Sequence, residues 1–484
     1  MGVVVNQSIK NVIITCLGFG VGAVNTLFLF TNFMDEKYYG MITYLISASN
    51  LIWPLMAFGV HNTLIKFFSS YINKDQQDRF LSQMLLLPFF IAIFLGLLGI
   101  LFYNTILNFV SDEDAIAKPY IWTIFVLAIA MSYFEVFFAW CKVKLKSVFG
   151  NLMKELFVRV LTFILLFFVY YQVISVEQFI YALITVYVLR MLIMMFYALS
   201  LHSVTFKLAL PNNYISVLKY SFLILIAGSV ASMLIDLDKV MIKQFLAIEN
   251  VAKYGICAYI ASVIIIPSRA MHQITYPLTA KLINERTYDQ LRELYKKSSL
   301  NLLIISGLLF ILIICNVTAL FNVIPDNYEL LIWVIILIGS SKLFDNFLGN
   351  NNSILYNSDH YRLVLYIGVG MALLSFVLNI VCIRQFGITG AAIATFIAVF
   401  CYNVAKLLIV KSKFKMHPFS NHTFFTAFII IAFVFAFYFW EFHFHPIINI
   451  ILKSILIGIT YGFVVYVTKM STDLNKLINN IFKR

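Results

Sequence analysis

The composition of this 484-residue chain excludes a soluble protein. Hydrophobic residues make up 62% and charged residues 12% of the sequence, whereas soluble domains are about half apolar and about one quarter charged. The mean hydropathy of +0.92 agrees with a chain that is solvated by lipid. The net charge of +13 comes from lysines and arginines spread over short loops rather than gathered in one patch, so we expect no nucleic-acid partner.

Apolar stretches of about 20 residues, the length that crosses a bilayer, recur along the chain. We count about fourteen of them, beginning with residues 11–33 after Lys10, and therefore predict an all-α polytopic membrane protein. The longest polar connections, residues 69–83 and 281–299, are too short to fold as separate domains.

The loop charges predict the orientation of these helices. With the amino terminus in the cytoplasm, roughly two dozen lysines and arginines fall on the cytoplasmic side and about six on the other side, which is the usual bias of membrane proteins. Acidic residues such as Asp35, Glu36 and Glu177 then occupy outer connections. We therefore expect an even number of helices, with both termini in the cytoplasm.

Two segments of the sequence resemble each other. The segment YYGMITYLISAS from Tyr38 is similar to KYGICAYIAS from Lys253, and each copy is followed by a proline, Pro54 or Pro267. Because both copies enter the membrane from the same side, we expect a parallel repeat of two pseudo-symmetric six-helix lobes, a design that places substrate between the lobes. Prolines bend helices, so the matched pair is a candidate for two hinges or for two fixed kinks.

The repeat also predicts how the chain is divided. The first lobe would comprise residues 1–208 and the second lobe residues 209–416. Two extra C-terminal helices and a cytoplasmic tail would occupy residues 417–484.

Four motifs give the sequence a family resemblance. They are EKYYG at Glu36, FGVHNTLIKFFSSY from Phe58, IDLDKVMIKQFLAIENVAKYG from Ile235 and FGITGAAIATFIA from Phe386. With these motifs the whole chain resembles the bacterial polysaccharide flippases, the oligosaccharide branch of the multidrug/oligosaccharidyl-lipid/polysaccharide exporter superfamily.

The resemblance implies both a fold and a function. The two lobes would form a V around a central cavity that faces the cytoplasm and the periplasm in turn. The cargo would be an oligosaccharide repeat unit linked to undecaprenyl pyrophosphate, as in O-antigen biosynthesis, and the protein would act in the bacterial inner membrane in contact with membrane lipids. The sugar composition, the oligomeric state and the choice between a proton and a sodium ion as coupling ion stay open.

Intramembrane cations are the candidate cargo-binding residues. A pyrophosphate anion cannot cross hydrocarbon unshielded, so a carrier needs lysine or arginine side chains that face an internal cavity. Arg190 and Arg269 have no acidic residue three or four positions away and are the first candidates. Either arginine could instead extend its head group to the membrane surface.

Three further cations have a structural alternative. Arg159 can pair with Glu155 one helical turn earlier, and Lys342 can pair with Asp345. Lys66 closes the second span, where a lysine commonly anchors a helix to the membrane surface.

Four carboxylates are candidates for binding a coupling ion. Asp236 and Asp238 lie at the end of the seventh span beside Lys239, itself a cargo-binding candidate, and an ion pair between Asp236 and Lys239 is the structural alternative. Glu135 lies in the fourth span, where an intramembrane carboxylate is a candidate for proton uptake, and Asp345 is the fourth candidate.

Other functions are weighed against the same sequence. A lipid II flippase is chemically close, and a cation-coupled multidrug extruder shares the fold but favours an acidic cavity. A glycan polymerase or ligase usually has a large periplasmic loop, whereas every outer connection here is short. The sequence has no Walker loop, nucleophile elbow or HExxH motif, and His443 and His445 are too few for a metal site, so we expect no enzyme, cofactor or metal.

Overall fold

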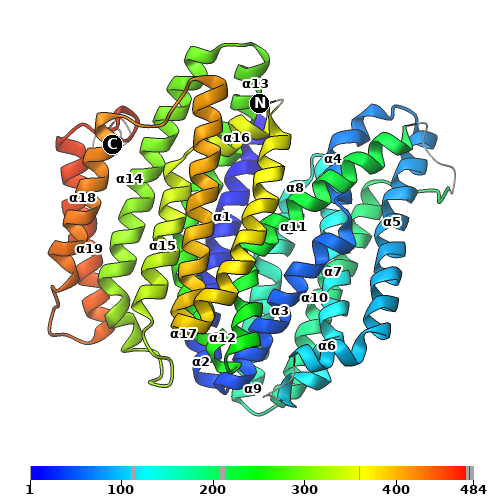
Figure 1. Cartoon of the computed structure of the whole chain (residues 1–484), viewed down its shortest axis with the longest axis horizontal. Coiled ribbons are helices and arrows are strands. Elements are labelled where there is room, and N and C mark those ends of the chain that lie inside the picture. Colours follow the sequence, from blue (N-terminus) through cyan, green and yellow to red (C-terminus); the bar gives the residue numbers. More distant parts are fainter. Residues whose placement is uncertain (1, 111–114, 208–212, 359, 476–478, 480–484) are drawn as a thin grey trace. The chain divides into compact units, whose positions relative to one another are not determined.

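A computed structural model describes residues 2–110, 115–207, 213–358, 360–475 and 479 of the chain. These residues form helices and connections with no strand, and Figure 1 shows the helices in chain order. The all-α fold predicted from the sequence is therefore confirmed.

Contacts between helices divide the chain into two compact units. Unit 1 comprises Met1–Gly255 together with Asn379–Gly387, and unit 2 comprises Ile256–Leu378 together with Ile388–Arg484. The lobe boundaries expected from the sequence repeat stay a prediction.

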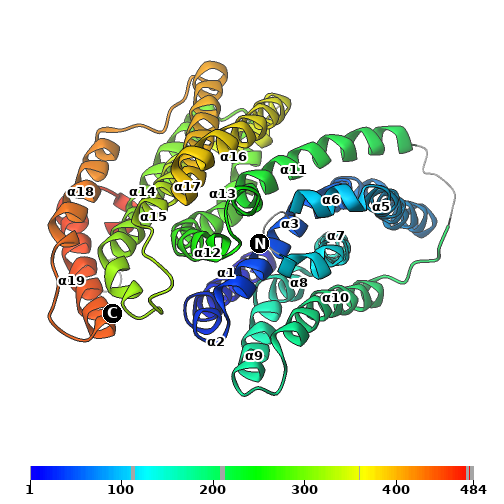
Figure 2. The ribbon, with the colours of Figure 1, turned by 60° about the horizontal axis from the view of Figure 1, so that its bottom comes forward.

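Unit 1 is built around a central helix, α7, which packs against α3, α4 and α10. Helix α11 packs in turn against α3 and α4, and Figure 2 shows it running beside α3. The hydrophobic core of unit 1 includes Phe134, Phe138 and Trp140 from α7. The helices of unit 1 are α1 (Gly2–Val24), α2 (Phe30–Phe33), α3 (Glu36–Ala57), α4 (Val60–Phe67), α5 (Lys74–Leu101), α6 (Tyr103–Val110), α7 (Ile121–Val143), α8 (Ser147–Leu152), α9 (Val158–Tyr170), α10 (Val176–Leu201) and α11 (Tyr214–Phe245).

Unit 2 is built around a long helix, α14, which packs against α13, α15, α18 and α19. A Cβ atom on Gly307 of α14 would lie 2.3 Å from the Ile430 side chain of α18, so glycine permits this close approach. Tyr461 of α19 donates a hydrogen bond to the Ile304 carbonyl oxygen at 3.0 Å. The remaining helices are α12 (Glu249–Ser262), which begins in unit 1, α13 (Ile266–Asn284), α14 (Tyr288–Phe321), α15 (Ile332–Phe347), α16 (Asn351–Tyr356), α17 (Tyr361–Phe414), α18 (Asn421–Tyr438) and α19 (Pro446–Val467).

Many of these helices are long and apolar enough to cross a membrane. The described residues contain 10 such helices, or 11 when the two bent halves of α11 are counted as one span. The number is smaller than predicted partly because α17 consists of two helices joined at Gly387, which has φ 58° and ψ −137°. Helix α15, with 16 residues, is shorter than a typical span of about 20. The count of fourteen stays a prediction.

The beginnings of the two segments that resemble each other in sequence pack together in unit 1, which contains the second segment only up to Gly255. A Cβ atom on Gly40 would lie 2.1 Å from the carbonyl oxygen of Ile248, and one on Gly255 would lie 3.2 Å from the side chain of Thr43. Two ion pairs cross the same contact, Lys37 with Glu249 at 3.8 Å and Glu36 with Lys253 at 3.7 Å. The shared Tyr-Gly motif thus serves close packing between the beginnings of α3 and α12.

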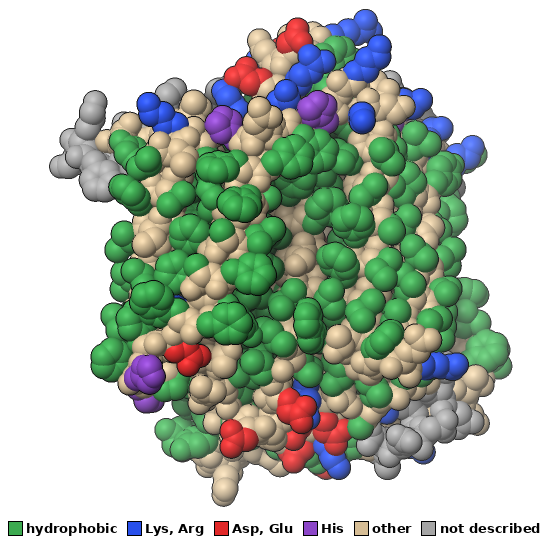
Figure 3. All heavy atoms as spheres, turned by 60° about the vertical axis from the view of Figure 1, so that its left-hand side comes forward, with side chains coloured by type: hydrophobic (Ala, Val, Ile, Leu, Met, Phe, Trp, Pro, Cys, Tyr) green, Lys and Arg blue, Asp and Glu red, His purple; other side chains and the backbone are tan. Residues whose placement is uncertain are grey.

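Charged side chains gather at the ends of the helices. On the face drawn in Figure 3, most lysine and arginine side chains lie at one edge and most aspartate and glutamate side chains at the opposite edge, each with some charges of the other sign, and hydrophobic side chains cover most of the surface between them. This distribution is that of a multi-pass membrane protein. Which edge faces the cytoplasm stays a prediction.

Candidate functional site

Arg190 is a buried cation of unit 1 that is held by aromatic rings. It lies on α10, is 7% exposed, and its guanidinium carbon is 4.1 Å from the ring centroid of Phe134 and 4.9 Å from that of Tyr187. Among the described residues, no carboxylate lies within salt-bridge distance of Arg190 and its Nε atom has no hydrogen-bond partner. Cation–π contacts stabilise the head group without neutralising it, so Arg190 has no directly paired carboxylate, and Glu135 and Glu155 act on its charge only from farther away.

Glu135 is close to several basic groups of the same unit. Its Oε1 atom is 2.5 Å from the Nζ atom of Lys154, which lies in a π-helical turn, Met153–Phe157. Lys142 and the half-buried His61 also interact electrostatically with Glu135. Glu135 in turn acts on Arg190 from beyond salt-bridge distance. We call Glu135, Lys142, Lys154 and Arg190 the basic cluster, because three cations in it face one carboxylate.

Arg159 forms the intrahelical pair that its spacing predicts. Its Nη1 atom donates to the Glu155 carbonyl oxygen at 2.9 Å and lies 3.3 Å from Oε2 of Glu155. A Cβ atom on Gly18 of α1 would lie 2.6 Å from the Arg159 head group, so glycine lets α1 approach this turn. Arg159 is therefore largely neutralised, unlike Arg190.

The aspartates of α11 are both hydrogen-bonded or ion-paired. Asp236 and Lys239 form the expected pair, with 2.8 Å between Oδ1 and Nζ. Asp238 is buried and accepts hydrogen bonds from the Tyr254 hydroxyl and, at 3.1 Å, from Nδ2 of Asn379. Tyr187, which touches Arg190, also interacts electrostatically with Asp236. Both Asp236 and Arg190 therefore act electrostatically on Tyr187, and the hydrogen bonds of Asp238 hold its side chain in place.

Lys66 and Arg269 are exposed. The Nζ atom of Lys66 lies over the rings of Tyr220, at 3.9 Å, and Phe67, at 5.6 Å. Arg269 follows Pro267 near the beginning of α13. Exposure fits the alternative explanation for both residues, that of a head group at the membrane surface.

The two candidate hinge prolines both lie beside breaks in helices. Pro54 is inside α3, which ends before Phe58 and Gly59, both with positive φ. Pro267 is at the beginning of α13, directly after a 3-10 turn, Val263–Ile265. Movement at either position stays a prediction.

Asp345 of unit 2 pairs with a lysine that the sequence analysis did not consider. The Nζ atom of Lys406 on α17 is 3.6 Å from Oδ1 of Asp345, 2.9 Å from Oδ1 of Asn352 and 4.4 Å from the ring centroid of Tyr402. Lys406 is 2% exposed. Lys342 is half-buried on the same helix as Asp345. The partner of Asp345 thus comes from another helix, which spacing within α15 could not reveal.

The sequence analysis also missed Lys154 and His61. Lys154 directly follows Leu152 and Met153 and looks like one more loop lysine in the sequence, because the π-helical turn that directs it toward Glu135 has no sequence signature. His61 was part of a family motif but carried no spacing signal of its own. Lys406 precedes three lysines of a charged helix end, so it resembles a surface residue until the helix is placed.

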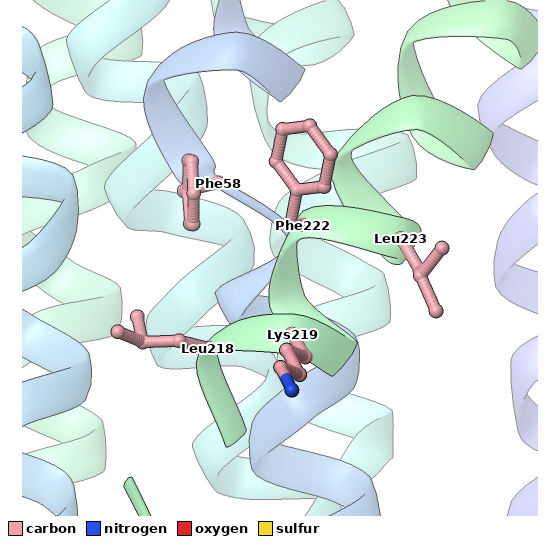
Figure 4. Close-up of a pocket in the computed structure, with 5 residues that line it drawn as sticks. All are labelled: Phe58, Leu218, Lys219, Phe222 and Leu223. Carbon is pink, nitrogen blue, oxygen red and sulfur yellow. The ribbon is translucent and has the colours of Figure 1, made fainter. Parts of the chain in front are cut away.

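A groove of about 490 Å³ opens on unit 1 between the end of α3 and α11. Phe58, Leu218, Lys219, Phe222 and Leu223 line it, and Figure 4 shows Phe58 in the turn after α3 and Phe222 on α11. None of the site residues predicted from the sequence lines this groove. Its apolar wall suits hydrocarbon rather than a charged head group.

Comparisons with known proteins identify the fold. No family model matches the chain, and no curated protein matches its sequence. The lipid II flippase MurJ in its inward-closed conformation matches with a TM-score of 0.75 at 15% identity, over 96% of this chain and 100% of that one. An inward-facing multidrug resistance transporter of the MATE family, in the MOP superfamily, matches with a TM-score of 0.60 at 13% identity, over 86% of this chain and 95% of that one.

A third solved structure belongs to the same group. It is a MOP-superfamily transporter from Pyrococcus furiosus, with a TM-score of 0.56 at 14% identity, over 85% of this chain and 95% of that one. At such identities the likeness establishes architecture rather than activity. The chain is a multi-pass membrane protein with the helical fold shared by MurJ and the MATE transporters.

Proposed function

We propose that the protein is a flippase for oligosaccharide repeat units linked to undecaprenyl pyrophosphate. It carries them from the cytoplasmic to the periplasmic leaflet of the bacterial inner membrane by alternating access, for the synthesis of a surface polysaccharide such as O-antigen. The fold shared with a flippase whose substrate is a lipid-linked sugar supports this type of cargo.

The observation that carries the proposal is that the buried Arg190 has no ion-paired carboxylate among the described residues. A buried cation with aromatic neighbours and no ion-paired carboxylate can bind an anion in place of its lost hydration. A pyrophosphate offers several oxygens to the planar guanidinium and to the lysines of the basic cluster. The excess of cations over acids argues against a cationic drug as cargo.

The other candidate residues have secondary roles in this proposal. Arg159, Arg269, Lys342, Lys239 and Lys66 stay candidates for contacts with the cargo. Glu135, Asp236, Asp238 and Asp345 stay candidates for binding a coupling proton or sodium ion, and Pro54 and Pro267 for hinges.

A lipid II flippase is the second candidate function. The match to MurJ extends over 96% of this chain. Lipid II and a repeat unit share the undecaprenyl pyrophosphate, so the same basic cluster suits both. The two cargoes differ only in the attached sugars and peptide.

Deletion of the gene tests the proposal. We expect lipid-linked repeat units to accumulate on the cytoplasmic leaflet while surface polysaccharide disappears and peptidoglycan synthesis continues. Accumulation of lipid II with cell lysis would favour the second candidate. Unchanged surface glycan and unchanged peptidoglycan, in a strain with no redundant carrier, would refute both functions.

A further inference from the structure

Three tyrosines from different helices of unit 2 lie close together. Tyr356 of α16 and Tyr402 of α17 have their hydroxyls within hydrogen-bonding reach of each other. Tyr276 of α13 is near enough to Tyr356 for an electrostatic interaction. Tyr276 is 45% and Tyr356 43% exposed, so two of the three rings offer open surface.

Polar side chains from the same three helices and from α15 adjoin these rings. Asp345 of α15 interacts electrostatically with both Tyr356 and Tyr402, and its side chain is 31% exposed. Lys406 donates a hydrogen bond to Asn352 and forms an ion pair with Asp345. Its ammonium group lies over the Tyr402 ring. His272 of α13 interacts with both Asp345 and Lys406. We call Tyr276, Tyr356, Tyr402, Asp345, Asn352, Lys406 and His272 the tyrosine cluster.

The chemistry of the tyrosine cluster does not suit an anion or a lipid tail. The charge of Lys406 is already offset by Asp345 at 3.6 Å, so little is left to attract phosphate. A patch with a carboxylate, an imidazole and phenol hydroxyls is equally unsuited to acyl chains, which offer no hydrogen bonds.

A carbohydrate can contact both the aromatic rings and the polar side chains of the tyrosine cluster. The apolar faces of sugar rings pack on aromatic rings, which supply large rigid contact areas at low entropic cost. Sugar hydroxyls donate and accept hydrogen bonds, as carboxylate, amide and phenol groups require. The buried Lys406 and the half-buried Asn352 would hold the exposed groups in place rather than bind cargo themselves.

We propose that the tyrosine cluster binds the glycan part of the cargo. This inference rests on the proposed function, in which the basic cluster of unit 1 binds the pyrophosphate. Tyr276 and Tyr356 would stack on sugar rings while Asp345 accepts hydrogen bonds from their hydroxyls.

The test compares two lipids bound to purified protein. One is undecaprenyl pyrophosphate, and the other is the lipid-linked glycan extracted from the deletion strain. We expect the Tyr276→Ala/Tyr356→Ala variant to bind the glycan-bearing lipid about tenfold more weakly than wild type while its affinity for the bare lipid is unchanged. Tyr276→Phe/Tyr356→Phe should keep most of the affinity, because the rings remain.

Matched controls separate the possible failures. Tyr288 and Tyr366 of unit 2 are 43% and 69% exposed and lie outside the cluster, so the Tyr288→Ala/Tyr366→Ala variant should bind both lipids like wild type. Equal affinity of wild type for the two lipids, or equal losses for both lipids in the cluster variant, would overturn the inference and leave the proposed function standing. Failure of wild type to bind either lipid would instead refute the proposed function.

Discussion

The two units differ in the surroundings of a buried cation. In unit 1 the guanidinium of Arg190 lies 4.1 Å from the ring centroid of Phe134 and has no salt-bridge partner among the described residues. In unit 2 the ammonium of Lys406 has Asp345 at 3.6 Å and the Asn352 amide oxygen at 2.9 Å. A free charge attracts an anion, whereas a compensated charge mainly holds its neighbours in place. The partners of a buried cation, rather than its burial, therefore indicate an anion site.

Replacing Arg190 should have the largest effect. Arg190→Ala removes hydrogen bonds to a charged group, each worth about 1.5–3 kcal/mol, so we expect binding of undecaprenyl pyrophosphate to weaken about 100-fold. Arg190→Lys should recover part of the affinity, because lysine keeps the charge but loses the planar fork. Binding to purified protein and transport in proteoliposomes measure both effects.

An exposed arginine provides the control for this experiment. Arg292 of α14 is paired with Asp289 at 3.6 Å on the surface of unit 2. Arg292→Ala should bind and transport like wild type. If Arg190→Ala kept full transport at normal expression, Arg190 would have no role in the site, and the contrast between the two units would lose its meaning.

Replacing Lys406 should affect stability rather than pyrophosphate binding. Lys406→Met leaves Asp345 without its partner, and a broken buried pair costs 3–5 kcal/mol. Because Asp345 is 31% exposed and water can reach it, we expect a smaller loss of about 2 kcal/mol in the free energy of unfolding. Thermal unfolding in detergent measures the loss.

The double variant Lys406→Met/Asp345→Asn sharpens this second prediction. Removing both charges should restore most of the stability, because no unpaired carboxylate remains. A loss of undecaprenyl pyrophosphate binding in Lys406→Met as large as in Arg190→Ala would contradict the comparison, since both lysine and arginine would then act as anion ligands.

The contrast between the units was only partly visible in the sequence. Apolar runs predicted the helices, and spacing predicted the pairs of Arg159 with Glu155 and of Asp236 with Lys239, because an intrahelical pair depends on sequence distance alone. The same reasoning singled out Arg190 by its lack of a local partner. Spacing could not predict pairs between helices. Glu135 pairs with Lys154 of another helix, and Asp345 pairs with Lys406, 61 residues later in the chain.

Replacing Glu135 should have the smallest effect and tests energy coupling. If Glu135 takes up a proton when the site opens to the periplasm, its ion pair with Lys154 weakens. The interaction of Lys154 with the cargo then changes with the protonation state of Glu135. Glu135→Gln would mimic the protonated state permanently, so an inward proton gradient should no longer stimulate transport in proteoliposomes. We expect the transport rate under the gradient to fall about fivefold, since a partly exposed ion pair contributes about 1 kcal/mol or less. Asp236→Asn is the parallel test for the carboxylate paired with Lys239. Unchanged stimulation in both variants would exclude these two carboxylates from coupling and leave the basic cluster as a fixed anion site.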